Sequence, residues 1–150
     1  MRILPVLSLL LFGACARRYD VRDQVGDFAR TVAEDVTRQG VTAWRTYFPE
    51  SPNFFMAVDG HLEFQNGADA HAKIPVIARS IKSIQLAWGD PIRIDTLTPE
   101  LAVFAAPWHE VINLADGNRT DASGYFTAVV EKREGRWQFR NAHWSTVPAK

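Results

Sequence analysis

The C-terminal part of the chain carries the side chains most capable of chemistry. Tyr125 and Thr127 stand on one predicted strand, and Asn141, His143 and Ser145 stand on the next. Alternate residues of a strand point to the same face, so the hydroxyl, amide and imidazole groups can share one surface. Imidazole is the side chain that most readily exchanges protons near neutral pH, so His143 can serve as a general base or as a donor that orients a ligand. The alternative is a structural histidine that ties the last strand to its neighbours.

The pairing of these two strands depends on the turn that joins them. A two-residue loop would require positive φ at Glu134, so we favour a three-residue loop, 133–135, with Gly135 in the left-handed position. The facing pairs are then Thr127 with Asn141, Tyr125 with His143, and Val129 with Phe139. We expect this face to form the wall of a cavity. The opposite face, with Phe126, Ala128 and Trp144 beside Gln138 and Arg140, is then exposed or a dimer contact.

Other polar residues give weaker indications of chemistry. Ser145 is a poor candidate nucleophile, because no acid is placed to orient His143. His109 and Glu110 are adjacent on a strand and point to opposite faces, and the four histidines lack a ligand spacing, so we expect no metal. The sequence also gives no indication of a cofactor. Asp90, which follows Trp88 closely and precedes a proline, is either an acid that opens onto the cavity or the cap of a loop.

Aromatic residues are abundant, with five tryptophans in 150 residues. Tryptophan and tyrosine rings carry one polar group and can bind a flat or apolar ligand, although most aromatic side chains in small domains fill the core. The predicted ligand-binding residues are Trp44, Tyr47, Trp88, Trp108, Tyr125, Thr127, Asn141 and His143, and the candidates for a catalytic role are His143, Tyr125 and Asp90.

The elements that must position these residues follow from hydrophobic periodicity. Apolar residues recur at helical spacing from Val25 to Val36, which predicts a helix over 22–39 that ends at Gly40. A short helix follows Thr42, and a third carries Ile74, with Pro75 in or near its first turn. The predicted strands are 53–58, 62–64, 84–88 with 92–97, 101–114, 123–132 and 136–146. Helices followed by long antiparallel strands indicate an α+β fold.

Composition predicts one ordinary globular domain, with 47% hydrophobic and 23% charged residues. Lys plus Arg equals Asp plus Glu, at 17 each. The chain therefore has no basic field that would gather nucleic acid, and we expect no nucleic-acid partner.

The N-terminus has the pattern of an export signal. A short apolar run from Ile3 to Phe12 follows Arg2 and is too short to span a bilayer. Gly13 and Ala14 precede Cys15, the only cysteine, and this resembles the lipobox of bacterial lipoproteins. The resemblance implies a signal peptide over 1–14, lipid on Cys15 and a tether over 15–21, which places the protein in the bacterial cell envelope. The alternative is an ordinary secreted, soluble protein.

The order of elements resembles the SnoaL-like branch of the nuclear transport factor 2-like superfamily. The resemblance covers about residues 22–147 and includes the positions Gly124, Thr127, Gly135, Trp137, Phe139, His143 and Ser145. It implies a cone-like α+β fold, in which a curved antiparallel sheet wraps a long N-terminal helix and, with two shorter helices, leaves a cavity at its mouth. It also implies frequent homodimers. The superfamily includes enzymes, binding modules and assembly domains, so the fold alone assigns no activity.

Two hypotheses of function remain. Ketosteroid isomerase of this superfamily uses a carboxylate base and a tyrosine, but alignment places Met56 and Val32 at those positions. We therefore favour a non-catalytic, lipid-anchored domain whose cavity binds a small apolar or aromatic molecule, or which binds a partner protein. The alternative is a small cyclase, isomerase or hydratase that uses His143, with Tyr125 or Asp90, for proton transfer.

Overall fold

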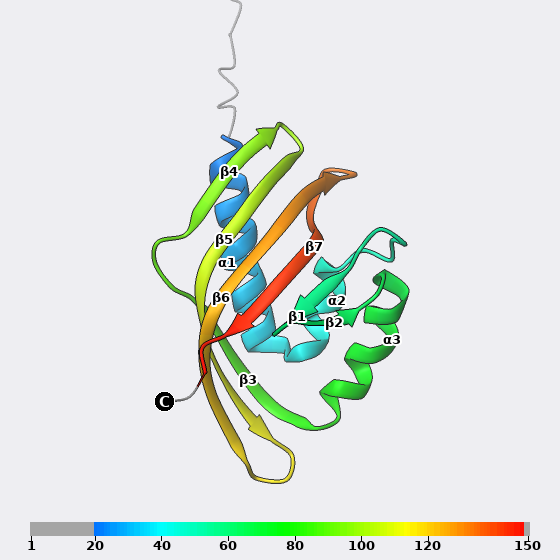
Figure 1. Cartoon of the computed structure of the whole chain (residues 1–150), viewed down its shortest axis with the longest axis vertical. Coiled ribbons are helices and arrows are strands. Elements are labelled where there is room, and N and C mark those ends of the chain that lie inside the picture. The colour runs from blue at the N-terminus through cyan, green and yellow to red at the C-terminus, as the bar shows by residue number, and fades with distance from the viewer. Residues whose placement is uncertain (1–19, 149–150) are drawn as a thin grey trace, which may run out of the picture.

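The computed structural model describes residues 20–148 and has helices on one side of a curved sheet (Figure 1). The predicted signal peptide, Cys15 and nearly all of the tether lie outside the described residues. The helical segments are α1 (Val21–Gln39), η1 (Val41–Ala43), α2 (Trp44–Tyr47) and α3 (Gly67–Ala78). The strands are β1 (Met56–Val58), β2 (His61–Phe64), β3 (Ile81–Trp88), β4 (Arg93–Thr98), β5 (Leu101–Leu114), β6 (Arg119–Arg133) and β7 (Arg136–Thr146).

Helix α1 confirms the helix predicted over 22–39. The carboxylate of Asp20 caps its first turn by accepting from the backbone N–H of Arg22 at 3.2 Å. Gly40 ends it with φ of 81°, a conformation that glycine adopts without steric cost. The helix buries one apolar face, formed by Val25, Phe28, Ala29, Val32 and Val36, against the concave side of the sheet.

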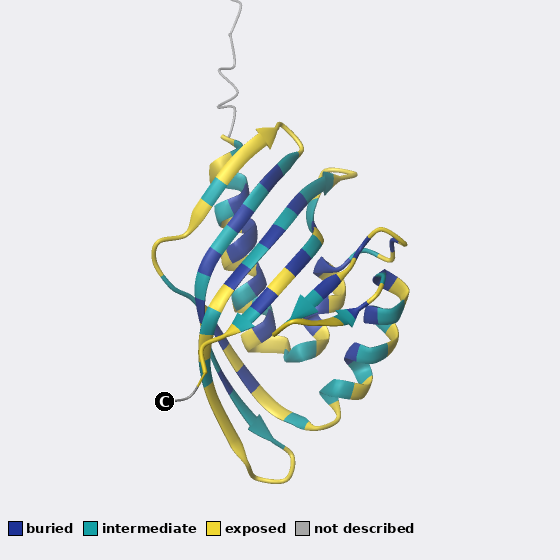
Figure 2. Ribbon diagram, in the orientation of Figure 1, coloured by how far each residue is buried: buried dark blue, intermediate teal, exposed yellow. Residues whose placement is uncertain are grey.

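The sheet is mixed, with strand order β2-β1-β7-β6-β5-β3. Both β3 and β4 pair antiparallel with β5, β3 along its C-terminal half and β4 along its N-terminal half. Strand β1 runs parallel to β7, with Met56 opposite Ala142, so the sheet is not purely antiparallel. Burial alternates along β5 and β6, which marks one face as core (Figure 2). The predicted α+β fold, a curved sheet around a long N-terminal helix, is confirmed.

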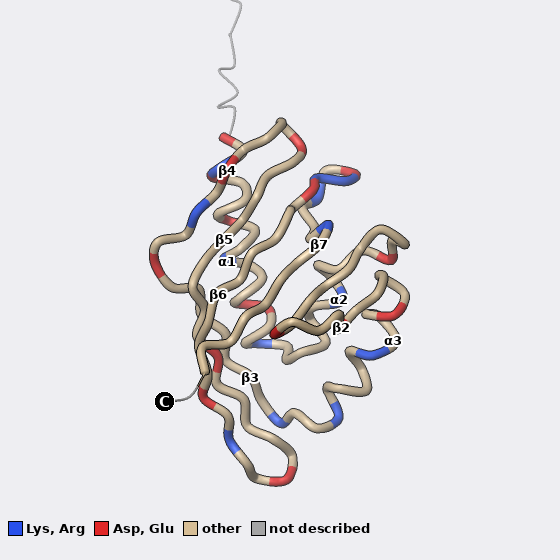
Figure 3. Tube along the Cα trace, viewed as in Figure 1, with Lys and Arg blue, Asp and Glu red and all other residues tan. Residues whose placement is uncertain are grey.

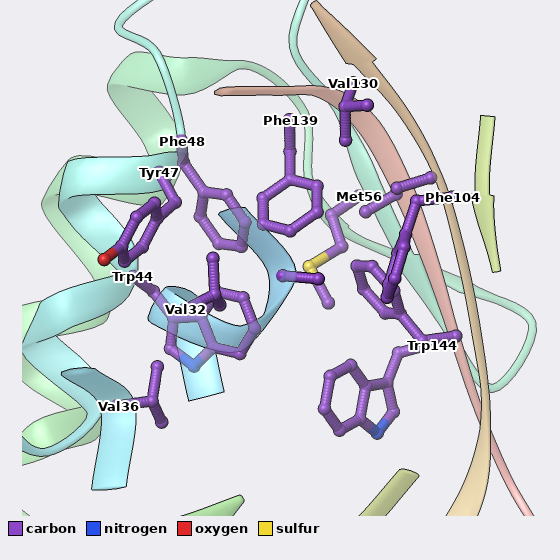
Figure 4. Close-up of a cluster of buried hydrophobic side chains, with 14 of the residues drawn as sticks. Val32, Val36, Trp44, Tyr47, Phe48, Met56, Phe104, Val130, Phe139 and Trp144 are labelled. Atoms are coloured by element: carbon purple, nitrogen blue, oxygen red, sulfur yellow. The ribbon is translucent and has the colours of Figure 1, made fainter. Parts of the chain in front are cut away.

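Aromatic rings from several elements meet inside the curve of the sheet (Figure 4). Phe139 of β7 lies at their centre, with its ring centroid 5.0 Å from that of Phe28 and 5.4 Å from that of Phe126. Trp44 stacks on Phe48 at 5.3 Å. Full burial of such a side chain contributes roughly 1.5–3 kcal/mol, so this cluster determines which face of each strand turns inward.

The turn between β6 and β7 differs from the predicted one. Arg133 pairs directly with Arg136, which leaves a two-residue loop with φ of 50° at Glu134 and 78° at Gly135. Positive φ costs a non-glycine residue roughly 1–2 kcal/mol. This cost is smaller than the cost of exposing the aromatic residues that the register buries, so the core overrides the local preference of the turn.

A β-bulge at Arg140 shifts the register once more, because Val130 pairs with Phe139 whereas Val129 pairs with Asn141. Thr127 therefore faces His143 and Tyr125 faces Ser145, so the three predicted pairings are wrong.

The predicted orientation of this ribbon is also wrong. Phe126 is fully buried and Ala128 and Trp144 are at least nine-tenths buried, whereas Tyr125 is 37% exposed. The polar residues share one face, as predicted, but that face is the outer one.

Helix α3 begins earlier than the position of Pro75 suggested. The side chain of Asn66 accepts from the backbone N–H of Asp69 at 2.9 Å and caps the helix, so Pro75 lies in its C-terminal half rather than in its first turn. Gly67 lies against the preceding loop, where a Cβ would come within 1.9 Å of the carbonyl oxygen of Pro49. This contact brings α3 beside the end of α2.

Positive and negative side chains are interleaved along the described part of the chain (Figure 3). The N-terminal half of β5, over 101–108, and the central stretch of β6, over 122–130, contain no Lys, Arg, Asp or Glu. Among the described residues, no helix has the length and apolar character needed to cross a bilayer.

Candidate ligand-binding cavity

A cavity of about 260 Å³ lies between the short helices, β1, β2 and the concave face of the sheet. Its wall is almost wholly apolar. Four aromatic residues line it, namely Trp44, Phe48, Phe64 and Trp144, together with Met56 and aliphatic side chains from α3, β3 and β5. Figure 4 shows Trp44 and Phe48 on the side of the helices, Trp144 on the side of the sheet and Met56 between them. A cavity with such walls favours an apolar or aromatic occupant.

Trp44 begins helix α2 and Phe48 follows its last residue, so the two rings are four residues apart and both reach the cavity. The hydroxyl of Tyr47 donates to Oδ2 of Asp35 on α1 at 2.5 Å, which fixes the short helix to the long one. Figure 4 shows this hydroxyl turned away from the other rings. Tyr47 therefore supports the cavity wall without lining it, since it opens instead onto a groove beside Phe28 and Trp137.

Helix α3 closes the cavity on another side with Ile74 and Ile77. Nε2 of His71 lies 2.7 Å from the carbonyl oxygen of Phe48, which ties α3 to the end of α2. The ammonium group of Lys73 donates to the carbonyl oxygen of Glu63 at 2.8 Å, which ties α3 to β2. The walls of the cavity are thus held by polar contacts at its rim.

Glu110 is the ionisable group set deepest in the sheet wall of this cavity. It lies on β5 between Trp108 and Ile112, all three on the inward side of the strand. Burial raises the pKa of the Glu110 carboxyl from 4.5 to about 7. Near neutral pH the group can therefore donate a hydrogen bond when protonated, accept one when ionised, or exchange a proton.

The neighbour of Glu110 on the strand points the other way. Nε2 of His109 lies 2.8 Å from Oδ1 of Asp121 on the outer face, and this contact together with Arg119 lowers the pKa of Asp121. The prediction that His109 and Glu110 face opposite sides is confirmed. Among the described residues, no group of three or more His, Cys, Asp or Glu side chains is arranged to hold a metal ion.

The predicted tryptophan and tyrosine residues have different positions. Trp44 lines the cavity, and Tyr47 lies behind its wall. The indole N–H of Trp88 donates to the carbonyl oxygen of Ala29 at 2.7 Å, in a separate groove between α1 and the strands β3 and β4. That of Trp108 donates to the carbonyl oxygen of Ser145 at 3.2 Å. Trp88 and Trp108 thus make structural contacts outside this cavity.

The remaining predicted residues do not meet at the cavity. Tyr125, Thr127, Asn141 and His143 share the outer face of the sheet, so their predicted place on a cavity wall is wrong. Within residues 20–148, the ring of His143 makes no hydrogen bond. Asp90 is exposed in the loop between β3 and β4. The structure thus does not bring the three candidate catalytic residues into one pocket.

Of the residues that line the cavity, sequence reasoning named only Trp44 and missed the others, among them Glu110 and Glu63. The alternation of β5 contained an indication of Glu110. Ala102, Phe104, Ala106 and Trp108 define the inward positions, and the next inward position is a glutamate. A charged residue at an inward position of an apolar strand requires a reason, and here it faces a cavity.

Comparisons with known proteins identify the fold. No family model matches the chain, and no curated protein matches it. Solved structures do. The nuclear transport factor 2-like superfamily protein from Salmonella enterica serovar Typhimurium LT2 is 18% identical over 87% of this chain and 92% of that one, with a TM-score of 0.72.

Two further solved structures belong to proteins described as enzymes. A proposed scytalone dehydratase from Novosphingobium aromaticivorans is 12% identical over 85% of this chain and 84% of that one, with a TM-score of 0.71. The hexachlorocyclohexane dehydrochlorinase LinA-type3 from Novosphingobium barchaimii is 14% identical over 85% and 86%, with a TM-score of 0.65. At these identities the comparisons show the fold, which is nuclear transport factor 2-like, and no activity.

Proposed function

We propose that this chain is a SnoaL-like, non-catalytic binding domain whose cavity holds a small, largely apolar or aromatic molecule. The observation that carries the proposal is the cavity itself, with four aromatic residues in its wall and the half-buried carboxyl of Glu110. Small-molecule sites in proteins combine such apolar walls with a few polar groups that orient the ligand.

The experiment is a binding titration with benzyl alcohol, a small aromatic probe with one hydroxyl, followed by NMR and by tryptophan fluorescence. Ile77→Trp fills the cavity from α3, and Ala33→Leu fills the separate groove beside α1 as a matched control. We expect Ile77→Trp to weaken binding at least about tenfold and Ala33→Leu to leave it unchanged. Shift changes centred on the α1 groove, or equal binding by both variants, would contradict the proposal.

Proton transfer is the second candidate function, and the position of Glu110 favours it. A carboxyl whose pKa is raised to about 7 can act as acid or base at neutral pH. Two neighbours in structure are a dehydrochlorinase and a proposed dehydratase, names that describe eliminations. His143, the residue expected for this role, lies on the outer face. Deuterium exchange at the methyl group of acetophenone, abolished by Glu110→Gln, would support catalysis over simple binding.

We also propose that the protein is exported and anchored by lipid on Cys15, in the bacterial cell envelope. The apolar run before Gly13-Ala14-Cys15 supports this proposal. Mass spectrometry of protein from a bacterial host should show a diacylglyceryl adduct on Cys15, and Cys15→Ser should move the protein to the soluble fraction. An unmodified chain that starts downstream of Cys15 would contradict it.

We also propose that two copies of the chain form a homodimer through the outer face of the sheet. The partly exposed side chains of Val103, Ala105, Pro107 and Tyr125 on this face form a largely apolar surface without charge. Thr127→Arg places a charge in that surface and should convert a dimer into a monomer in analytical ultracentrifugation. A wild-type protein that sediments as a monomer at high concentration would contradict this assembly.

A further inference from the structure

The ionisable residues that line the cavity are both acids. Glu110 stands on β5 and Glu63 on β2, whereas the lining residues from α2, α3, β1, β3 and β7 are all uncharged. A cavity of one charge sign surrounded by low-dielectric walls favours ligands of the opposite sign.

The aromatic wall suits the same kind of ligand. Trp44 and Trp144 meet edge to face, with ring centroids 6.1 Å apart at 86°, and Phe48 stacks on Trp44. Aromatic faces attract cations electrostatically, with Trp the strongest of them, and sets of such rings recognise ammonium groups in proteins. Rings and carboxyls together therefore offer both types of contact that an organic cation needs.

In the described part of the chain, Glu110 is not paired with a positively charged side chain. Within residues 20–148 its carboxyl makes no hydrogen bond or ion pair. The cation at the rim is Lys73, and its ammonium group lies 3.0 Å from Oδ2 of Asp69 and 2.8 Å from the carbonyl oxygen of Glu63. Lys73 is thus engaged at the rim, and the ionised form of Glu110 is left without a counter-charge.

We infer that the occupant of this cavity is a small organic cation, a protonated amine on an aromatic or aliphatic body. The inference rests on the proposed binding function and specifies its ligand class. The ammonium group pairs with Glu110, the body lies against Trp44 and Trp144, and Glu63 adds negative potential from β2.

The pH dependence of binding follows from this pairing. Burial raises the pKa of Glu110 to about 7, so the free protein holds the group mainly protonated at about pH 5.5 and mainly ionised at about pH 8. An ammonium ligand binds the ionised form, and its affinity should rise as pH increases through this range. A neutral ligand that accepts a hydrogen bond from the protonated acid shows the opposite trend.

The test compares benzylamine with benzyl alcohol, two probes of similar shape that differ in charge. Each is titrated into the protein at about pH 5.5 and about pH 8 and followed by tryptophan fluorescence and NMR. Three proteins are compared, namely wild type, Glu110→Gln, and Glu100→Gln as a control. Glu100 is exposed in the turn between β4 and β5, so the control makes the same chemical change away from the cavity.

We expect wild type and Glu100→Gln to bind benzylamine at least about tenfold more tightly than benzyl alcohol at pH 8, with a smaller preference at pH 5.5. Glu110→Gln should bring the two affinities within about twofold while retaining benzyl alcohol, which also shows that the variant is folded. If Glu110→Gln does not fold, the pH profile of wild type alone decides.

Equal affinity of the two probes for wild type, or a preference for benzylamine that neither pH nor Glu110→Gln alters, would overturn the cation inference and leave the proposed binding function intact. Failure of both probes to bind would overturn both proposals.

Discussion

The hydroxyl of Tyr47 on α2 and the carboxylate of Asp35 on α1 are joined by a hydrogen bond of 2.5 Å. Asp35 also accepts from the side chains of Arg38 and Gln39. Because Tyr47 lies between Trp44 and Phe48 in the chain, this bond positions the aromatic wall of the cavity from behind.

Removal of that hydroxyl should loosen α2. Tyr47→Phe keeps the ring and loses a hydrogen bond to a charged group, which contributes roughly 1.5–3 kcal/mol. The bond from Tyr47 is the largest cause that lowers the pKa of Asp35, so this stabilisation is present at neutral pH and is lost as pH falls through the lowered pKa. Urea unfolding at pH 7 and near pH 3 measures both effects. A loss of stability that is equal at both pH values would contradict this account.

Gly124 should tolerate no side chain. A Cβ there would lie 1.8 Å from the carbonyl oxygen of Ser145 and 2.8 Å from the ring of Trp108. Gly124→Ala must displace the backbone of β7 as well as that ring, so we expect a loss of roughly 1–3 kcal/mol, as for other overpacked sites. Gly26→Ala in α1 is the control, because its Cβ meets only Ile94 at 3.8 Å and alanine favours a helix. In thermal unfolding, Gly124→Ala should lower the melting temperature and Gly26→Ala should raise it. Equal effects of the two substitutions would contradict this account.

The buried carboxyl should make stability depend on pH. The pKa of Glu110 is raised in the folded state, so the residue destabilises the fold increasingly as pH rises from about 4.5 to 7 and by a constant amount above that. The shift corresponds to at most about 3 kcal/mol. The stability of Glu110→Gln relative to wild type should therefore increase from pH 5 to pH 8, as measured by urea unfolding. The account fails if the difference between the two proteins is the same at both pH values.

Adjacent residues on β7 should differ sharply in their contribution to stability. His143 is exposed on the outer face, and His143→Ala should change the free energy of unfolding by no more than about 0.5 kcal/mol without altering ligand binding. Trp144 is buried with its ring 4.4 Å from that of Trp108, and Trp144→Ala should cost roughly 3–5 kcal/mol. Guanidinium unfolding of both variants measures this contrast. A large loss of unfolding free energy in His143→Ala would show that the imidazole is buried in the core and would contradict this account.

Most of the fold could be predicted because it depends on periodicities that are local in the sequence. The apolar spacing from Val25 to Val36 predicts α1 within a residue, and Gly40 marks its end. The turns at Asp59-Gly60 and Asp116-Gly117 lie where their residue types indicate. Such patterns need no knowledge of the rest of the molecule.

The candidate site could be predicted less well than the fold, because it depends on two features that are not local in the sequence. The positive φ of Glu134 is disfavoured locally and is stabilised only by the core that the resulting register buries. The bulge at Arg140 is absent from any strand pattern, yet it decides that Trp144 turns inward beside Phe126 and that His143 turns outward beside Thr127. The assumption that polar residues mark the cavity then selected the wrong face, since the interior here is almost wholly apolar.

The most direct measurement of the central claim is a crystal structure of the protein soaked with 4-bromobenzyl alcohol, in which anomalous scattering locates the bromine. The account predicts a bromine peak inside the cavity among Trp44, Phe48 and Trp144, with the hydroxyl toward Glu110. A bromine peak confined to the groove beside α1 or to the outer face of the sheet, with the cavity empty, would contradict it.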